Sequence, residues 1–587
     1  GNYNTVVGDE AGTAITTGNS NVALGYQAGA SLTGGNSNVA IGYQALLTED
    51  SYGANIAIGD SALKLQDSGA TAYNIAIGHE AGSAITTGVQ NILIGGLAGD
   101  AITDQSNITA VGNTALTANT SGQRGTAVGA AALASNTTGN FNTAVGFTAL
   151  TNNTTGYNNA AFGYQSMATN TTGVNNNAFG NATLTTNTTG SSNVAMGHGA
   201  LNLNTTASNN TAVGYFALLA NTTGTNNVAV GKNALDANTT ANANIAVGAG
   251  SLGANTTGAS NIGIGHEALG ANTTGGENTA IGYAALDANT TASNNTAVGY
   301  LSLSANTTGV NNVAVGSLAL DSNTTGASNV ALGANALDAN TTASNNTAVG
   351  FDALTTNTTG SENTAVGGLS SDSITTGTNN TSIGYDSLSA TTTGASNTAL
   401  GDSALKANTT ASNNTAVGQS ALLANTTGDL NVAVGSAALD ANTVGDRNVA
   451  IGSNSLTTFN PSSNADTYNT AVGALSLKNL TTGTLNTAIG GQAMELATTG
   501  GSNVAMGYGA LNANTTGGNN VAIGTGALDA NTTASNNTVV GKDAATANTT
   551  GDSMTAIGFG ALANNTTAAN NTAVGYIAMI SNTTGTE

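Results

Sequence analysis

The sequence predicts an all-β protein, a parallel β-solenoid (β-roll) of 17-residue coils, from two observations. The pentapeptide NTAVG at residues 210–214 returns, lightly varied, along the whole chain. Its final glycine recurs at a fixed interval of 17 residues, as at Gly231, Gly248 and Gly265. A fixed period of this kind indicates a repeat architecture in which each repeat forms one coil of a stack.

The recurring glycine, called here the register glycine, is numbered 0, and other positions in a coil are numbered by their distance from it. It occurs 34 times, from Gly8 to Gly575. Only two steps are longer than 17 residues, and we expect the insertions, near residues 60–77 and 453–472, to form loops. The second contains the only proline, Pro461, which lacks the N–H that a strand ladder needs.

Composition supports one continuous array over residues 1–587 rather than several globular domains. The net charge is −22 with only seven Lys and Arg, which argues against nucleic-acid binding. The absence of cysteine excludes disulfides and thiolate metal sites, and no apolar run is long enough for membrane insertion within this segment. Because the array starts and stops within a coil, we expect a segment of a longer fibre protein.

Positions −3 to −1 predict a short β-strand in every coil. Position −1 is always Val, Ile, Leu, Phe or Met, and position −3 is mostly Val, Ile or Thr. Alternate residues of a strand face the same side, so we expect both to face the core. Position +4, usually Leu, is expected to be a second core position. The predicted core anchors are Val213, Leu218, Val230, Val247 and Ile264.

Position −2 must then face away from that core, yet it is Ala in nearly every coil and never Lys, Glu or Gln. One explanation is a crowded turn that admits only a small side chain. The explanation that we favour is a stripe that packs against another chain. The predicted interface stripe includes Ala212, Ala229, Ala246, Ala280, Ala297 and Ala314.

The rest of the coil predicts a turn, a short second strand and another turn. The segment Asn-Thr-Thr-Gly, as at residues 221–224, suits the last turn, and its Asn and Thr would stack into side-chain ladders. Where position +4 is Gly or Ser instead of Leu, position +7 becomes Ile or Leu, as in the pair Gly82 and Ile85. We expect this exchange because each coil must fill one fixed interior volume.

The sequence predicts no catalytic, cofactor-binding or metal-binding residues. His79, His198 and His266 each follow a register glycine, where other coils carry Tyr, and they are several coils apart. We expect them to pack as Tyr does. The alternative is a histidine ring formed by copies in an oligomer, which would be a metal or anion site. The Asp residues at +5, such as Asp287, Asp321 and Asp338, are too sparse for a calcium array. Asn-Thr-Thr and Asn-Asn-Thr also match the N-glycosylation acceptor pattern.

The runs NTAVGY at residues 210–215, Ala217-Leu218 and NTTG at residues 221–224 resemble the head repeats of trimeric autotransporter adhesins and related phage tail-fibre repeats. The resemblance covers the whole chain. It implies a left-handed roll, three parallel rolls in a homotrimer, and an extracellular, often adhesive, role. No ligand-binding residue of the family can be matched to this sequence.

The favoured function is that of a structural and adhesive extracellular fibre or filament, non-catalytic, that acts through length, rigidity and multivalent display. Its expected partners are copies of itself, as a homotrimer or an end-to-end polymer, and a cell-surface or matrix ligand. The alternatives are a phage tail-fibre shaft for host attachment, an ice-binding β-solenoid and, less favoured, a carbohydrate-active enzyme. Adjacent threonines such as Thr222 and Thr223 would point to opposite sides, which argues against a flat ice-binding face.

Overall fold

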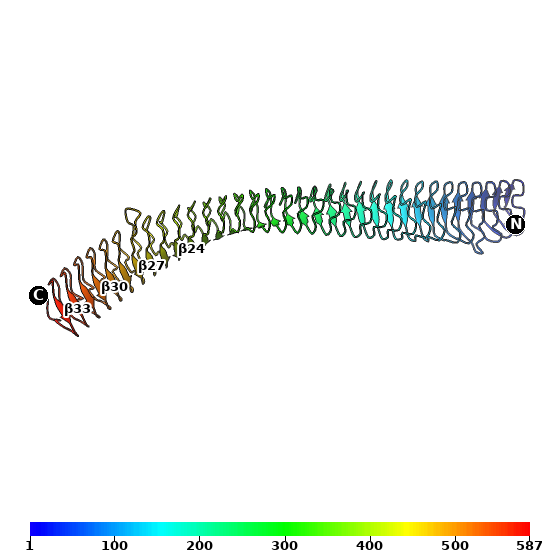
Figure 1. Ribbon diagram of the computed structural model, residues 1–587. Helices are drawn as coiled ribbons and strands as arrows, with labels where there is room; N and C mark the ends of the chain where they lie inside the picture. The colour runs from blue at the N-terminus through cyan, green and yellow to red at the C-terminus, as the bar shows by residue number, and fades with distance from the viewer. Residues whose placement is uncertain (587) are drawn as a thin grey trace. The chain divides into compact units, whose positions relative to one another are not determined.

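The computed structural model describes residues 1–586 and confirms the predicted fold class. Within the described residues the protein is a parallel β-solenoid without helices, built of 17-residue coils. The chain divides into two compact units, Gly1–Ser293 and Asn294–Glu587. In each unit the coils stack one on the next, and every coil contributes one three-residue strand to a parallel sheet (Figure 1).

The strands of the first unit are β1 (Thr5–Val7), β2 (Val22–Leu24), β3 (Val39–Ile41), β4 (Ile56–Ile58), β5 (Ile75–Ile77), β6 (Ile92–Ile94), β7 (Thr109–Val111), β8 (Thr126–Val128), β9 (Thr143–Val145), β10 (Ala160–Phe162), β11 (Asn177–Phe179), β12 (Val194–Met196), β13 (Thr211–Val213), β14 (Val228–Val230), β15 (Ile245–Val247), β16 (Ile262–Ile264) and β17 (Thr279–Ile281). The strands of the second unit are β18 (Thr296–Val298), β19 (Val313–Val315), β20 (Val330–Leu332), β21 (Thr347–Val349), β22 (Thr364–Val366), β23 (Thr381–Ile383), β24 (Thr398–Leu400), β25 (Thr415–Val417), β26 (Val432–Val434), β27 (Val449–Ile451), β28 (Thr470–Val472), β29 (Thr487–Ile489), β30 (Val504–Met506), β31 (Val521–Ile523), β32 (Thr538–Val540), β33 (Thr555–Ile557) and β34 (Thr572–Val574).

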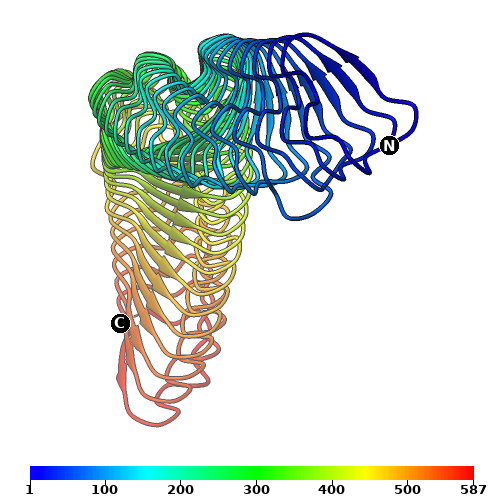
Figure 2. The same cartoon turned by 90° about the vertical axis from the view of Figure 1, so that its right-hand side faces the viewer.

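Within each unit, consecutive strands pair so that equal coil positions lie side by side. In the pair β13 and β14, for example, Ala212 is the partner of Ala229. The insertions do not disturb this register, because Ile56 still pairs with Ile75 and Val449 with Thr470. The extra residues leave the stack as loops, as predicted. Figure 1 shows the second loop beside β27, and Figure 2 shows the first loop (blue) projecting from its coil.

The register glycine is required for two reasons. Gly214 has φ +141°, a conformation that side chains other than glycine's rarely adopt. A Cβ atom on Gly214 would also lie 2.3 Å from the carbonyl oxygen of Gly231 in the next coil. The glycine row therefore allows neighbouring coils to approach closely.

The strand faces the opposite way from our prediction, which makes four of the five core anchors wrong. Val213 and Val230 are half-buried, whereas Val247 and Ile264 are 36% and 38% exposed. Positions −3 and −1 thus face outwards, and position −2 faces the interior. The fifth anchor, Leu218 at +4, is fully buried, as predicted.

The predicted interface stripe is also wrong, because these alanines form the core of their own chain. The following residues are fully buried within the single chain: Ala212, Ala229, Ala246, Ala280, Ala297 and Ala314. No surface of theirs is left for a second chain to contact.

A narrow interior explains why position −2 is small. It lies against positions +3 and +4 across the coil. At Gly263, one of the exceptions, a Cβ atom would lie only 2.6 Å from Ser251 Oγ and 3.3 Å from Leu252 Cγ. The rejected explanation, crowding, is therefore closer to the truth, although the crowding is inside the coil rather than in a turn.

Larger residues at position −2 occur where position +4 carries a small residue instead of Leu. Leu93 replaces the usual Ala, and a Cβ atom on Gly82 or Gly99 at +4 would lie 2.5 Å or 2.9 Å from its methyl carbons. The predicted exchange between +4 and +7 is confirmed as well, since Ile85 and Ile102 are fully buried beside these glycines. Both substitutions conserve the filled volume of the interior.

The predicted second strand is absent, because positions +2 and +4 are left-handed. Phe216 has φ +55° and Leu218 has φ +53°. A segment in which every second residue has a positive φ cannot form a β-strand. It still bonds from coil to coil, since the N–H of Leu218 donates to the carbonyl of Ala234 at 2.9 Å.

The predicted asparagine ladders are present as two buried rows. In the +7 row, Asn221 Nδ2 donates to Asn204 Oδ1 of the preceding coil and to the Gly224 carbonyl, both at 3.0 Å. In the −4 row, Asn210 Nδ2 donates to the same Gly224 carbonyl at 2.9 Å. The Oδ1 of Asn210 accepts from the backbone N–H of Asn227 at 2.9 Å. A regular coil such as that of Gly214 thus has a largely apolar layer of positions −2, +3 and +4, and beside it a polar layer whose asparagines are hydrogen-bonded.

Candidate functional surfaces

The outward side of the strands, called here the outer strand face, consists of an apolar row at position −1 and a row of mostly Val, Ile and Thr at position −3. No residue at either position is Asp, Glu, Lys or Arg in any coil. The faces of both units include large side chains that are more than a third exposed: Leu24, Val128, Phe179, Met196, Ile281, Leu332, Leu400, Ile451, Met506 and Ile557. A long apolar surface without charge indicates an interaction site.

Aromatic side chains and histidines occur at position +1 in several coils. Rings in neighbouring coils stack, as Tyr26 does on Tyr43 with centroids 5.5 Å apart. His198 stacks on Tyr215 at 5.5 Å, which confirms that a histidine here packs as a tyrosine does. The ring of His266 lies 5.4 Å from that of its neighbour in the same way.

The third histidine has a different neighbour. His79 Nε2 lies 3.9 Å from Asp60 Oδ2, and both side chains are about half exposed. The structure places the three histidines in separate coils, and among the described residues none belongs to a cluster of metal-ligating groups.

The threonine rows differ in what their hydroxyl groups do. Thr222 at +8 donates its Oγ1 to the carbonyl of Thr239 in the next coil at 3.0 Å, whereas Thr223 at +9 is exposed. The glycosylation patterns also differ, because Asn221 is fully buried and Asn209, the first residue of Asn-Asn-Thr, is exposed. Only the second pattern presents its asparagine to an enzyme in the folded protein.

The Asp row at +5 is half-buried. Burial raises the pKa of Asp287, and the negative charge of Glu267 raises it further. Burial also raises the pKa of Asp338, with smaller contributions from Asp321 and Asp352. In the described residues these side chains do not gather into a group of three metal-ligating residues.

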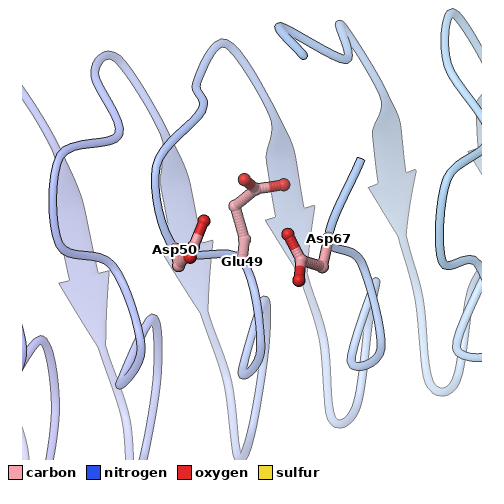
Figure 3. Close-up of side chains that lie close together, drawn as sticks. All are labelled: Glu49, Asp50 and Asp67. Atoms are coloured by element: carbon pink, nitrogen blue, oxygen red, sulfur yellow. The ribbon is translucent and has the colours of Figure 1, made fainter. Parts of the chain in front are cut away.

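A buried carboxylate, Glu49, occupies position +7, where most coils carry Asn. Its side chain is fully buried, and its Oε1 accepts a hydrogen bond from the N–H of Tyr52 at 3.1 Å. Burial raises the pKa of Glu49 to about 7; the charges of Asp67 and Asp50 add to the shift, and the N–H groups of Tyr52 and Ser68 oppose it. Figure 3 shows Glu49 between Asp50 and Asp67.

Sequence reasoning missed this cluster. The signal was available, because Glu replaces Asn at +7 in the coil of Gly42, and Asp replaces Thr at +8 both there and in the next coil. These substitutions become visible only when the +7 and +8 rows are compared coil by coil, because most coils carry Asn-Thr there.

Comparison with known proteins assigns no family. No family model matches the chain, and the curated proteins include no match to it. The part of the chain that the structure describes contains no helix that is long and apolar enough to cross a membrane. The coil geometry therefore stands alone as evidence for function.

Proposed function

We propose that this protein is a structural and adhesive fibre protein that acts outside the cell, without catalysis, through length, rigidity and multivalent display. In this proposal three copies lie in parallel and associate through the outer strand face as a homotrimer. The observation that carries the proposal is the uncharged outer strand face, whose apolar −1 position recurs on every strand of both units.

Periodicity makes a second copy the best-fitting occupant of this face. A partner that matches the face over many coils must repeat its own contacts at the spacing of the coils. A copy of the same chain has this spacing, so its −1 and −3 rows would meet equivalent rows in register. Association would remove from water side chains such as Met196 and Met506, which a soluble protein does not ordinarily expose in a continuous row.

The interior supports the proposed rigidity. Within each unit, coils bond to their neighbours through the strand, the turn segment and the asparagine rows, as with Thr222 and Asn221. Side chains that remain outside the outer strand face, such as Thr223 and Tyr215, recur at fixed intervals. Weak contacts from such repeated groups to a cell-surface or matrix ligand would add through multivalency.

The solution mass of the chain, measured by light scattering, tests the assembly. The variant carries Asp at −1 in eight coils, at Val111, Val145, Val213, Val247, Val298, Val349, Val417 and Val472. We expect the wild type to have the mass of three chains and the variant that of one, because unpaired charges would be buried at each interface. The control carries Asp at +9 of the same coils, adds the same charge, and should remain trimeric.

Other results would overturn the proposal. A wild-type monomer, or a variant that keeps the trimer mass, would mean that the outer strand face is not the interface. Electron microscopy of the same samples tests end-to-end association, which predicts filaments of several lengths.

A phage tail-fibre shaft would share this assembly, and its expected distinction is binding to a bacterial surface rather than to host matrix. The ice-binding alternative rests on the exposed threonine row that includes Thr223. Thermal hysteresis near the freezing point would support it, although the hydroxyl of the neighbouring Thr222 is already bonded within the stack. Release of reducing sugars from a glycan panel would contradict a non-catalytic role.

A further inference from the structure

We propose that Glu49, Asp50 and Asp67 bind one Ca²⁺ ion at the first insertion of the solenoid. The three residues each offer a carboxylate oxygen, and these atoms all lie within 4.8 Å of one another. Two oxygens that each lie about 2.4 Å from one Ca²⁺ ion can be at most about 4.8 Å apart. The spacing of the three carboxylates is thus compatible with a single ion.

The stacking of the coils produces the cluster. Asp50 and Asp67 both occupy position +8 of neighbouring coils, and Glu49 occupies position +7 beside Asp50. Most coils carry Asn-Thr at these positions, and these uncharged side chains bond to neighbouring coils. Asn221 donates to Asn204 of the preceding coil, and Thr222 donates to Thr239 of the next coil. In Figure 3 the side chain of Glu49 lies between the two aspartates, and the Asp67 carboxylate is turned towards it.

The buried oxygen of Glu49 is the independent observation that indicates a ligand. Glu49 is fully buried, and its Oε2 has no hydrogen-bond partner. Among the described residues, no Lys, Arg or His forms an ion pair with Glu49, Asp50 or Asp67. A buried carboxylate oxygen without a partner is costly, and a cation would remove that cost.

The donor set favours calcium. All three ligands are carboxylates, without nitrogen or sulfur, which suits hard cations. Asp50 and Asp67 are exposed, so water can complete the six to eight oxygens that Ca²⁺ takes in flexible geometry. Mg²⁺ demands a nearly ideal octahedron, which an irregular site beside an inserted loop does not provide.

The ion would fasten two coils where the period breaks. Glu49 and Asp50 precede β4, and Asp67 lies in the longer segment between β4 and β5. Binding of the ion would join the inserted segment, through Asp67, to the preceding coil, through Glu49 and Asp50. We therefore expect Ca²⁺ to stabilise this region of the first unit most.

Equilibrium dialysis of the full chain against Ca²⁺ tests the site, with Glu49→Gln and Asp67→Asn as variants. The wild type should bind one Ca²⁺ per chain more tightly than either variant, by about tenfold or more, with affinity on the order of 10⁻⁴ to 10⁻³ M. Gln66 occupies the same +7 row in the next coil, so Gln at position 49 is compatible with the fold. Asp67 is exposed, so its substitution leaves the core intact.

The matched control is Asp338→Asn, which removes a carboxylate in the other unit and should leave Ca²⁺ binding unchanged. Hydrogen exchange checks that the variants fold and should show Ca²⁺-dependent protection near residues 49–77 in the wild type alone. Equal Ca²⁺ binding by the wild type and both variants would overturn the proposal, as would no binding to the wild type at millimolar Ca²⁺. Tighter binding of Mg²⁺ than of Ca²⁺ would overturn the choice of ion.

Discussion

The coil of Gly214 and the coils of Gly42 and Gly59 have the same backbone plan but differ in their buried polar row. At Gly214 the row is Asn in successive coils, and Asn221 bonds to Asn204 and to its own turn. At the first insertion the row reads Leu32, Glu49 and Gln66. There Glu49 Oε2 has no hydrogen-bond partner.

The difference shows how a repeat satisfies buried polar groups. When each coil carries the same residue, the donor of one coil always meets the acceptor of the next. One changed residue leaves partners unmatched in its own coil and in its neighbours. A departure from the repeat in a buried row is therefore a better indicator of a special site than an acidic residue on the surface.

The largest expected effect concerns the glycine row, which both regions share. Gly214→Ala and Gly59→Ala should each destabilise their coils by about 4 kcal/mol or more, because a Cβ atom would lie 2.3 Å from the next glycine's carbonyl oxygen in both. Local hydrogen exchange measures this loss coil by coil. Gly69→Ala, in the inserted loop with open space around it, should cost only about 1 kcal/mol. A mild effect of Gly59→Ala would mean that the insertion loosens the stack.

A smaller loss is expected when the regular polar row is broken. Asn221→Ala should destabilise the neighbouring coils by about 2–3 kcal/mol, because it leaves the buried Asn204 Oδ1 without a donor. Hydrogen exchange of residues 204–238 provides the measurement. Thr223→Ala, on the exposed row, should change stability by less than about 0.5 kcal/mol. Equal effects of the two substitutions would show that the buried ladder contributes little.

The sequence predicted the period, the strand at −3 to −1, the loops and the asparagine ladders, because these follow from spacing and turn chemistry. The second strand that it predicted in each coil is absent, because residues such as Phe216 and Leu218 have positive φ. It did not predict which side of the strand faces inwards. We assigned the larger side chains, such as Val213, to the interior, whereas the interior is too narrow for them beside Leu218. The substitutions at −2 carried the missing information, since Leu93 occurs where position +4 is glycine. The acidic cluster depends on contacts between coils, which spacing within one coil does not reveal.

Substitution of Glu49 in the +7 row should stabilise the protein in the absence of Ca²⁺, whereas substitution of Asn221 in the same row should destabilise it. In EDTA at pH 8, Glu49→Gln should stabilise the coils around the first insertion by about 1–2 kcal/mol, because it removes a buried charge whose Oε2 has no hydrogen-bond partner. In saturating Ca²⁺ the order should reverse, since the wild type alone retains all three carboxylate ligands. Hydrogen exchange in the two buffers measures both differences. A variant that is less stable than the wild type in EDTA would show that the carboxylate is well satisfied without an ion.

The smallest effect concerns pH and the half-buried Asp row. Burial raises the pKa of Asp338 above that of the unfolded chain, so the folded state binds the proton more tightly. The resulting stabilisation is present at low pH and is lost as the pH rises from the ordinary Asp value through the raised one. Asp338→Asn should therefore flatten the pH dependence of the stability of its coils above the ordinary Asp pKa of about 4, as measured by hydrogen exchange relative to the wild type. Because no ligand is involved, this row should respond to pH identically with and without Ca²⁺. A Ca²⁺-dependent response at Asp338 would place cation binding in the regular coils and remove the distinction from the first insertion.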